Sequence, residues 1–178
     1  MGSGHPEVSQ EELFSVLFPV EKSIRYHRRR RAFYDSWHRW LMLGVILAGS
    51  ASVADVIPSY PKVLGLIIAL FGASDLVFGL SDKARDHDFL MRRFCHLMAD
   101  MRSCSEPTRA HVDRWQVERI QIEADEPATY WALEAACFNE ATRAFDRNRD
   151  DEVHLAWYYR LTKNYFQYDP TRFKAVGQ

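Results

Sequence analysis

The sequence predicts an all-α protein: a two-helix transmembrane hairpin whose long helices extend into a cytoplasmic helical bundle. Two apolar runs, residues 40–57 and 63–80, are separated only by the short segment PSYPK. Basic residues are concentrated on the outer flanks of this pair. Strand-like alternation of apolar and polar residues does not persist anywhere in the 178 residues, so no β-sheet is expected.

The two apolar runs have the length of membrane spans. Each contains about 18 residues, and roughly 17–25 are needed to cross a bilayer at about 1.5 Å per residue. Each run contains one acid, Asp55 in the first and Asp75 in the second. Proline cannot continue a helix, so Pro58 and Pro61 predict a tight turn between two helices. A buried core hairpin in a soluble protein is the competing interpretation, because runs of this length are borderline.

The charges around the hairpin predict its orientation. Only Lys62 lies in the turn, whereas many basic residues lie outside it: Lys22, Arg25, Arg28, Arg29, Arg30, Arg31 and Arg39 before the first run, and Lys83, Arg85, Arg92 and Arg93 after the second. Basic residues in short loops favour the cytoplasmic side. The sequence therefore predicts a multi-pass protein of the bacterial inner (plasma) membrane with both termini in the cytoplasm.

Three domains are expected along the chain: residues 1–19, 20–103 and 104–178. In the first, Ser9 and Glu12 have the spacing of a capping box, and we expect a short amphipathic helix that Pro19 ends. Residues 20–40 contain no Gly or Pro, so a second helix should run unbroken into the first span. The second span should likewise continue unbroken to Ser103.

The third domain should be helical. Residues 108–124 have an apolar side typical of a helix, and Pro127 near a helix start predicts another over 128–145. A polar turn, RNRDDE, precedes a last helix expected over 152–168. We expect these helices to form the cytoplasmic domain that binds a ligand, a partner or one another.

Motifs of common enzymes are missing from the sequence. It contains no GxGxxG, GxxxxGK[ST], GxSxG or HExxH, which would indicate nucleotide binding, acyl transfer or zinc proteolysis. The three cysteines form no CxxC pair, and the seven histidines are scattered. His87, flanked by Asp86 and Asp88, is expected to be a solvated surface residue. We therefore expect no enzymatic activity, no metal site and no cofactor.

A basic and aromatic segment precedes the first span. Arg28, Arg29, Arg30 and Arg31 form its basic block, and their two alternatives are contact with anionic lipid headgroups or binding of nucleic acid or a nucleotide. The position just before a span favours lipid, and no nucleic-acid partner is expected. Aromatic side chains at both ends of the spans should form the interfacial belt: Trp37, Trp40 and Tyr60.

Small residues recur on one face of each run. They are Gly44, Ala48, Ala51 or Ser52, and Asp55 in the first, and Gly65, Gly72, Asp75 and Gly79, with Ile68, in the second. Small residues at this spacing let helix backbones approach closely. A carboxylate within a bilayer rarely faces lipid. Asp75 should therefore face the bundle interior, a partner or water, or else pair with Lys83 or Arg39 near the cytoplasmic edge.

The arrangement of segments resembles a known family. A basic-aromatic helix, IRYHRRRRAFYDSWHRW, enters the first span, and a charged helix with two histidines, KARDHDFLMRRFCHLMADM, follows the second. This order, from about Ile24 to the C-terminus, is similar to the SLATT group of two-span effectors in prokaryotic nucleotide-sensing and anti-phage conflict systems. The resemblance implies a homo-oligomeric pore-forming effector that responds to a nucleotide signal or a sensor partner. It places the pore face at Gly72, Asp75 and Gly79.

Two other functions are compatible with the sequence. The chain could be a membrane-anchored adaptor that binds partners through its cytoplasmic helices without forming a pore. It could also be a soluble helical interaction module in which the apolar pair is the core. The sequence does not specify the activating signal, the number of subunits or an ion preference.

Overall fold

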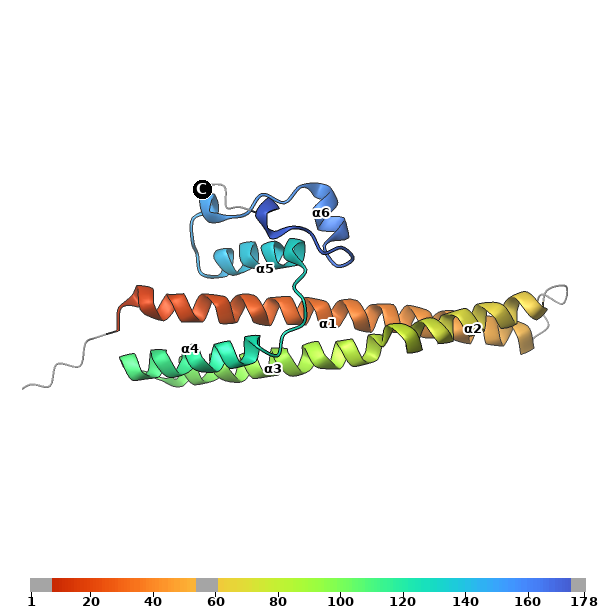
Figure 1. Ribbon diagram of the computed structural model, residues 1–178, viewed down its shortest axis with the longest axis horizontal. Coiled ribbons are helices and arrows are strands. Elements are labelled where there is room, and N and C mark those ends of the chain that lie inside the picture. Colours follow the sequence, from red (N-terminus) through yellow and green to blue (C-terminus); the bar gives the residue numbers. More distant parts are fainter. Residues whose placement is uncertain (1–7, 54–60, 174–178) are drawn as a thin grey trace, which may run out of the picture. The chain divides into compact units, whose positions relative to one another are not determined.

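The computed structural model describes residues 8–53 and 61–173 (Figure 1). The all-α prediction is confirmed, because these residues form helices and no strand. The elements are α1 (Gln10–Val53), α2 (Pro61–Phe78), α3 (Leu80–Ser103), α4 (Arg109–Glu123), α5 (Trp131–Ala144), the 3-10 helix η1 (Arg149–Asp151), α6 (Trp157–Thr162) and the 3-10 helix η2 (Pro170–Arg172). The expected turn around Pro58 lies outside the described residues, as do Asp55 and Tyr60.

The first helix is longer than expected. The capping box is present, because the Ser9 hydroxyl accepts from the Glu12 backbone at 3.1 Å and Glu12 accepts from the Ser9 backbone at 3.2 Å. The prediction that Pro19 ends this helix is wrong: α1 is one helix of 44 residues with Pro19 inside it. Val16 and Val20 are fully buried on either side of the proline. Their burial offsets the hydrogen bond that a proline removes from a helix.

The helix that follows the turn is interrupted once. We expected it to be unbroken to Ser103, but α2 ends at Phe78 and α3 begins at Leu80. Gly79 separates them with φ = +55°, a left-handed conformation that side chains with a Cβ rarely adopt. The Gly79 backbone still donates to Asp75 and accepts from Lys83, each at 3.0 Å.

The chain divides into two compact units. One, which we call the bundle unit, contains residues up to Arg28 and from Asp88 onward; the other, the paired-helix unit, is Arg29–His87. Both boundaries fall inside helices, α1 and α3. The domain boundaries expected at residues 19–20 and 103–104 stay predictions.

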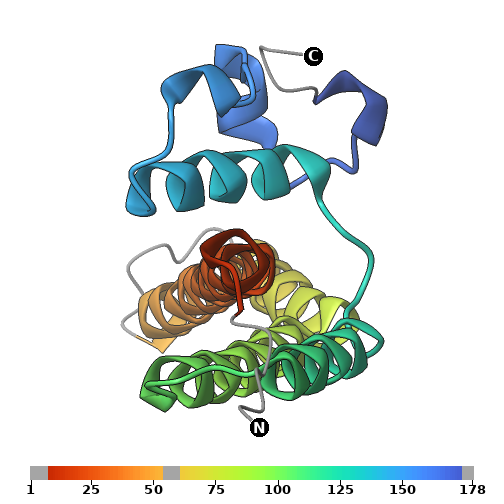
Figure 2. The ribbon, with the colours of Figure 1, turned by 90° about the vertical axis from the view of Figure 1, so that its left-hand side faces the viewer.

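The bundle unit has a well-packed core where α1, α3 and α4 meet (Figures 1 and 2). At its centre the Trp115 indole is fully buried and donates a hydrogen bond to Asp100 at 2.6 Å. The buried members of this core are Val16, Val20, Ile24, Leu90, Phe94, Leu97, Met98, Met101, Val112, Trp115 and Ile122. Helix α4, which begins after Thr108, confirms the helix expected over 108–124.

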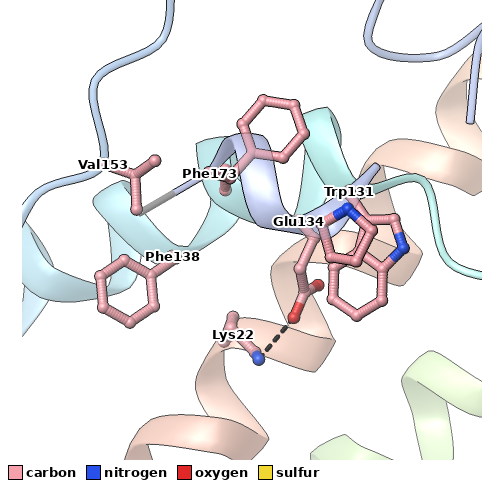
Figure 3. A pocket seen from close by; sticks show the side chains of 8 residues that line it. Lys22, Trp131, Glu134, Phe138, Val153 and Phe173 are labelled. Atoms are coloured by element: carbon pink, nitrogen blue, oxygen red, sulfur yellow. Dashed lines mark ion pairs between the residues drawn. The ribbon is translucent and has the colours of Figure 1, made fainter. Parts of the chain in front are cut away.

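The last part of the bundle unit differs from the expected helix over 152–168. Helix α6 has only six residues, and Val153 is held in a non-helical conformation by Asn139 of α5. The Asn139 amide donates to the Val153 carbonyl at 2.8 Å and accepts from its N–H at 2.7 Å. Because both backbone groups of Val153 are already bonded, a helix cannot begin before it. A cavity of about 350 Å³ lies beside this segment (Figure 3).

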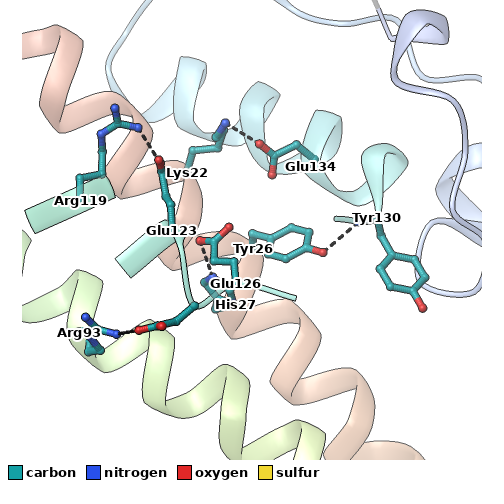
Figure 4. Close-up of polar contacts among 10 residues, drawn as sticks. Lys22, Tyr26, His27, Arg93, Arg119, Glu123, Glu126, Tyr130 and Glu134 are labelled. Atoms are coloured by element: carbon teal, nitrogen blue, oxygen red, sulfur yellow. Dashed lines mark hydrogen bonds and ion pairs between the residues drawn. The ribbon is translucent and has the colours of Figure 1, made fainter. Parts of the chain in front are cut away.

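Polar contacts join α5 and the segment before it to the bundle helices (Figure 4). His27 is fully buried and stacks on Phe94, with ring centroids 5.7 Å apart. Its Nε2 lies 3.0 Å from a carboxylate oxygen of Glu126. Three other pairs accompany it: Lys22 with Glu134 at 2.5 Å, the Tyr130 N–H with the Tyr26 hydroxyl at 3.0 Å, and Arg93 with Asp125. The contacts from Lys22 and Tyr26 join α1 to α5 and its N-cap, and the other two hold the segment before α5.

Two glycines test the interruption between α2 and α3. Gly79→Ala should destabilise the protein by about 1–2 kcal/mol, because alanine is strained at positive φ. Gly72→Ala is the matched control within α2, where an added Cβ meets nothing within 4 Å. It should stabilise by up to about 1 kcal/mol through helix propensity. Reversible unfolding in mixed micelles, followed by circular dichroism, measures both, and effects of equal sign would contradict the assignment.

Candidate functional site in the paired helices

Within the paired-helix unit, one face of α1 contacts α2 and the start of α3. Two of the contacting residues are four apart, which is the spacing that places side chains on one helix face, and the third lies six residues further along α1. The contacts involve Tyr34, His38 and Gly44 on α1. Ala48 is also buried, with 8% exposure. At Gly44 the neighbouring group is the Phe71 ring of α2.

The polar centre of this interface is a pair of His38 and Asp75. The His38 Nδ1 atom lies 2.9 Å from the Asp75 Oδ1 atom, and the imidazole N–H donates to the carboxylate. The two side chains are 36% and 21% exposed. We expected an interior position for Asp75 or a pair with Lys83 or Arg39. Asp75 is half-buried against α1, and His38 supplies the observed contact.

Gly44 accommodates an aromatic ring from α2. A Cβ added at this position would lie 2.3 Å from Cε2 of Phe71, far inside van der Waals contact. A side chain here would force the helices apart or rotate Phe71 out of the interface. Gly44 therefore sets the distance between the two helices one to two turns beyond His38.

The small residues of α2 do not share one environment, contrary to the single face that we expected. Asp75 faces α1, whereas Gly65 and Gly72 are exposed, and an added Cβ meets nothing within 4 Å at either glycine. Gly79 lies at the junction with α3, where the backbone has a positive φ that favours glycine. The side chain of Ser52, like Asp55, lies outside the described residues.

The basic block is less uniform than a headgroup-binding surface requires. Arg28 is exposed, Arg29 is half-buried, and Arg31 lies 3.5 Å from Asp35. Arg30 is a correction to the prediction: it is 1% exposed, so it does not present a free charge to a headgroup. Its guanidinium lies 4.5 Å from the centroid of the Tyr34 ring and donates to the Tyr34 hydroxyl. This cation–π contact keeps the charge within the protein.

An aromatic contact that was not predicted from the sequence joins Tyr34 of α1 to His87 of α3. His87 is buried, with 4% exposure, and stacks on Tyr34 with the ring centroids 5.7 Å apart. It is therefore not a solvated surface residue, although it lies between two acids. Lys83 lies on the same ring, with its Nζ 6.0 Å from the centroid.

The outer surface of the paired helices is apolar. Leu76 is 85% exposed and Val77 is 77% exposed, and many neighbours are similar. The other large exposed apolar side chains of this unit are Trp37, Trp40, Leu43, Ile46 and Leu47 on α1, and Val63, Leu66, Leu70 and Phe78 on α2. Soluble monomers rarely expose contiguous apolar patches larger than a few hundred Å².

One described helical stretch is long and apolar enough to cross a membrane. It lies within residues 62–103 and contains an 18-residue segment with a mean hydropathy of 2.2, of which 6% is buried. The first apolar run is described only to Val53. Among residues 8–53 and 61–173, no group of three or more His, Cys, Asp or Glu side chains could hold a metal ion.

Comparisons of the chain with models of protein families, with curated proteins and with solved structures gave no match. The resemblance to the SLATT group therefore rests on the arrangement of sequence segments alone.

A double-mutant cycle tests the pair of His38 and Asp75. His38→Leu alone leaves a half-buried carboxylate without this partner and should destabilise by about 1–3 kcal/mol. The double variant His38→Leu, Asp75→Leu should recover most of that loss, because both polar groups are then replaced by apolar ones. Unfolding in mixed micelles measures the coupling, and strictly additive losses would show that the two side chains do not interact.

Proposed function

We propose that this chain is an oligomeric, non-enzymatic pore-forming effector of the bacterial inner membrane. The observation that carries the proposal is the outward apolar surface of the paired helices, together with the half-buried pair of ionisable side chains between them, His38 and Asp75. The SLATT-like order of segments in the sequence supports a role in anti-phage or abortive-infection defence.

Lipid explains the outward apolar surface best. Burying one large aliphatic side chain away from water is worth about 1.5–3 kcal/mol, and eight exposed aliphatic side chains of this unit, from Leu43 to Val77, face outward. On this proposal α2 and the last part of α1 both cross the membrane. The basic flanks then place both ends of the chain on the cytoplasmic side.

Several copies are needed for a pore, because two helices cannot enclose a path for water. The exposed face with Gly65 and Gly72 offers a surface for a second copy, since small residues let neighbouring helices approach closely. A closed ring of identical contacts would repeat the pair of His38 and Asp75 once in each copy. We propose that this ring of carboxylates faces the water path when the pore opens.

A membrane-anchored adaptor is the second candidate, and α6 favours it. This short helix and the residues after it expose Trp157, Tyr158, Leu161, Tyr165 and Phe166, each by at least 45%. Aromatic side chains are enriched at protein interfaces, so a partner protein could bind there. An adaptor needs the same lipid-facing helices but no assembly of them into a ring.

Release of a dye from liposomes separates the two candidates. Purified protein reconstituted into vesicles should release an entrapped dye, and Gly72→Leu and Asp75→Leu should each reduce release about tenfold or more. Each removes an element that the pore needs, the close contact or the polar lining. Ala73→Leu is the matched control, because Ala73 is a small exposed neighbour on the same turn.

Three results would count against the pore. Vesicles that stay intact over a wide range of protein-to-lipid ratios would favour the adaptor. If Gly72→Leu and Asp75→Leu release as much dye as the unmodified protein does, the leakage does not depend on these residues. Detection of monomers alone by native mass spectrometry in detergent would contradict the proposed ring of several copies.

A further inference from the structure

The cavity in the bundle unit is independent of the paired helices. Its volume is about 350 Å³, within the range of about 300–1,000 Å³ that small-molecule sites occupy. Figure 3 shows α5 forming one wall, the terminal segment another, and Lys22 of α1 at the edge. The lining residues are Lys22, Trp131, Glu134, Ala135, Phe138, Val153, Pro170 and Phe173.

Three of the lining side chains are aromatic. Trp131, Phe138 and Phe173 come from two different parts of the chain and line one space (Figure 3). The Trp131 residue is 38% exposed, so its indole is available for stacking. Aromatic side chains around one space suit a planar ring system, because aromatic groups stack in offset or edge-to-face arrangements.

The polar part of the lining is electrically balanced. The Lys22 ammonium lies 2.5 Å from Glu134 Oε1, and these two are the only charged side chains in the lining given above. The pair leaves donors on Lys22 and a second acceptor oxygen on Glu134. A singly charged ligand would have to compete with one member of the pair for the other. A phosphate would find only the Lys22 ammonium, whose charge Glu134 already neutralises, so the lining does not favour it.

The lining is held in place by hydrogen bonds outside the cavity. Asn139 fixes Val153 through two bonds, and the Tyr26 hydroxyl fixes the start of α5 by accepting from Tyr130. Asp169 caps η2 by accepting from the Thr171 hydroxyl at 2.7 Å and its N–H at 2.9 Å. These bonds lower the pKa of Asp169. Pre-organised walls reduce the entropy lost on binding.

We propose that this cavity is a binding site for a neutral aromatic ligand with a hydrogen-bond donor and an acceptor on one edge, such as an aromatic carboxamide. The ring stacks between Trp131 and the two phenylalanines. The carbonyl oxygen of the amide accepts from Lys22, and its NH₂ group donates to Glu134. The ion pair stays intact on binding.

Three probes of equal shape test the charge preference: 2-naphthamide, 2-naphthoate and 2-naphthylmethylammonium. Binding to the full chain in micelles is followed through the indole N–H resonances, assigned by Trp131→Phe. The Trp131 resonance should shift and saturate with the amide, about tenfold more tightly than with either charged probe, because a charged group must displace one member of the pair. The buried Trp115 resonance should not move and reports that the core is intact.

Removing either charge of the pair should change which probe binds most tightly. Glu134→Gln leaves Lys22 without its counter-charge, so 2-naphthoate should become the tightest probe. Lys22→Met leaves Glu134 unpaired, so the ammonium probe should become the tightest. Asp113→Asn, which removes an exposed ion pair with Arg109 on α4, is the matched control and should leave the order unchanged.

Two outcomes would overturn the proposal. One is a Trp131 resonance that does not shift with any of the three probes at millimolar concentration, while Trp115 reports a folded core. The other is an order of affinities that is the same in the unmodified protein, Glu134→Gln and Lys22→Met. Neither outcome bears on dye release from vesicles, so this site and the pore are tested separately.

Discussion

The outward apolar surface of the paired helices is the constraint on which the other features depend. A soluble protein would have to cover this surface, whereas a bilayer removes it from water without further protein contacts. Two polar contacts lie within this unit: His38 contacts Asp75, and Arg30 lies against Tyr34. In an apolar medium a polar group without a partner is expensive.

Helices α1 and α3 each belong to both units, which gives the two parts of the molecule a shared covalent framework. In the bundle unit the helices bury an ordinary core around Trp115 and Phe94. In the paired-helix unit the same chain changes composition, and its outward side becomes apolar. Gly79 marks the change of direction between α2 and α3.

The local features of the fold could be predicted from the sequence, and the features that depend on tertiary contacts could not. Ser9 and Glu12 interact three residues apart, so their capping box was predictable. Pro19 would end most helices, but α1 continues past it because the burial of Val16 and Val20 stabilises the helix on both sides. The last helix was predicted too long, because the amide that fixes Val153 comes from Asn139, on another element.

The candidate site shows the same limit. The apolar runs and Asp75 were evident from composition, but the partner of Asp75 depends on the rotation of α1 against α2. His38 lies 37 residues away in the chain, and no periodicity within either helix reports that rotation. For the same reason Gly44 and Gly72 looked equivalent, although one accommodates Phe71 and the other faces outward. Arg30 and Tyr34 are four residues apart on one helix, so a contact between them was predictable. The burial of Arg30 was not predictable, because it depends on tertiary packing.

Photo-crosslinking in living cells tests most directly whether lipid surrounds the paired helices. A benzoylphenylalanine residue placed at Leu76, which is 85% exposed, should yield phospholipid adducts detectable by mass spectrometry, while the same residue at the exposed Gln116 of α4 should yield none. Recovery of the chain in the soluble fraction as a compact monomer, with no lipid adduct at Leu76, would contradict the account.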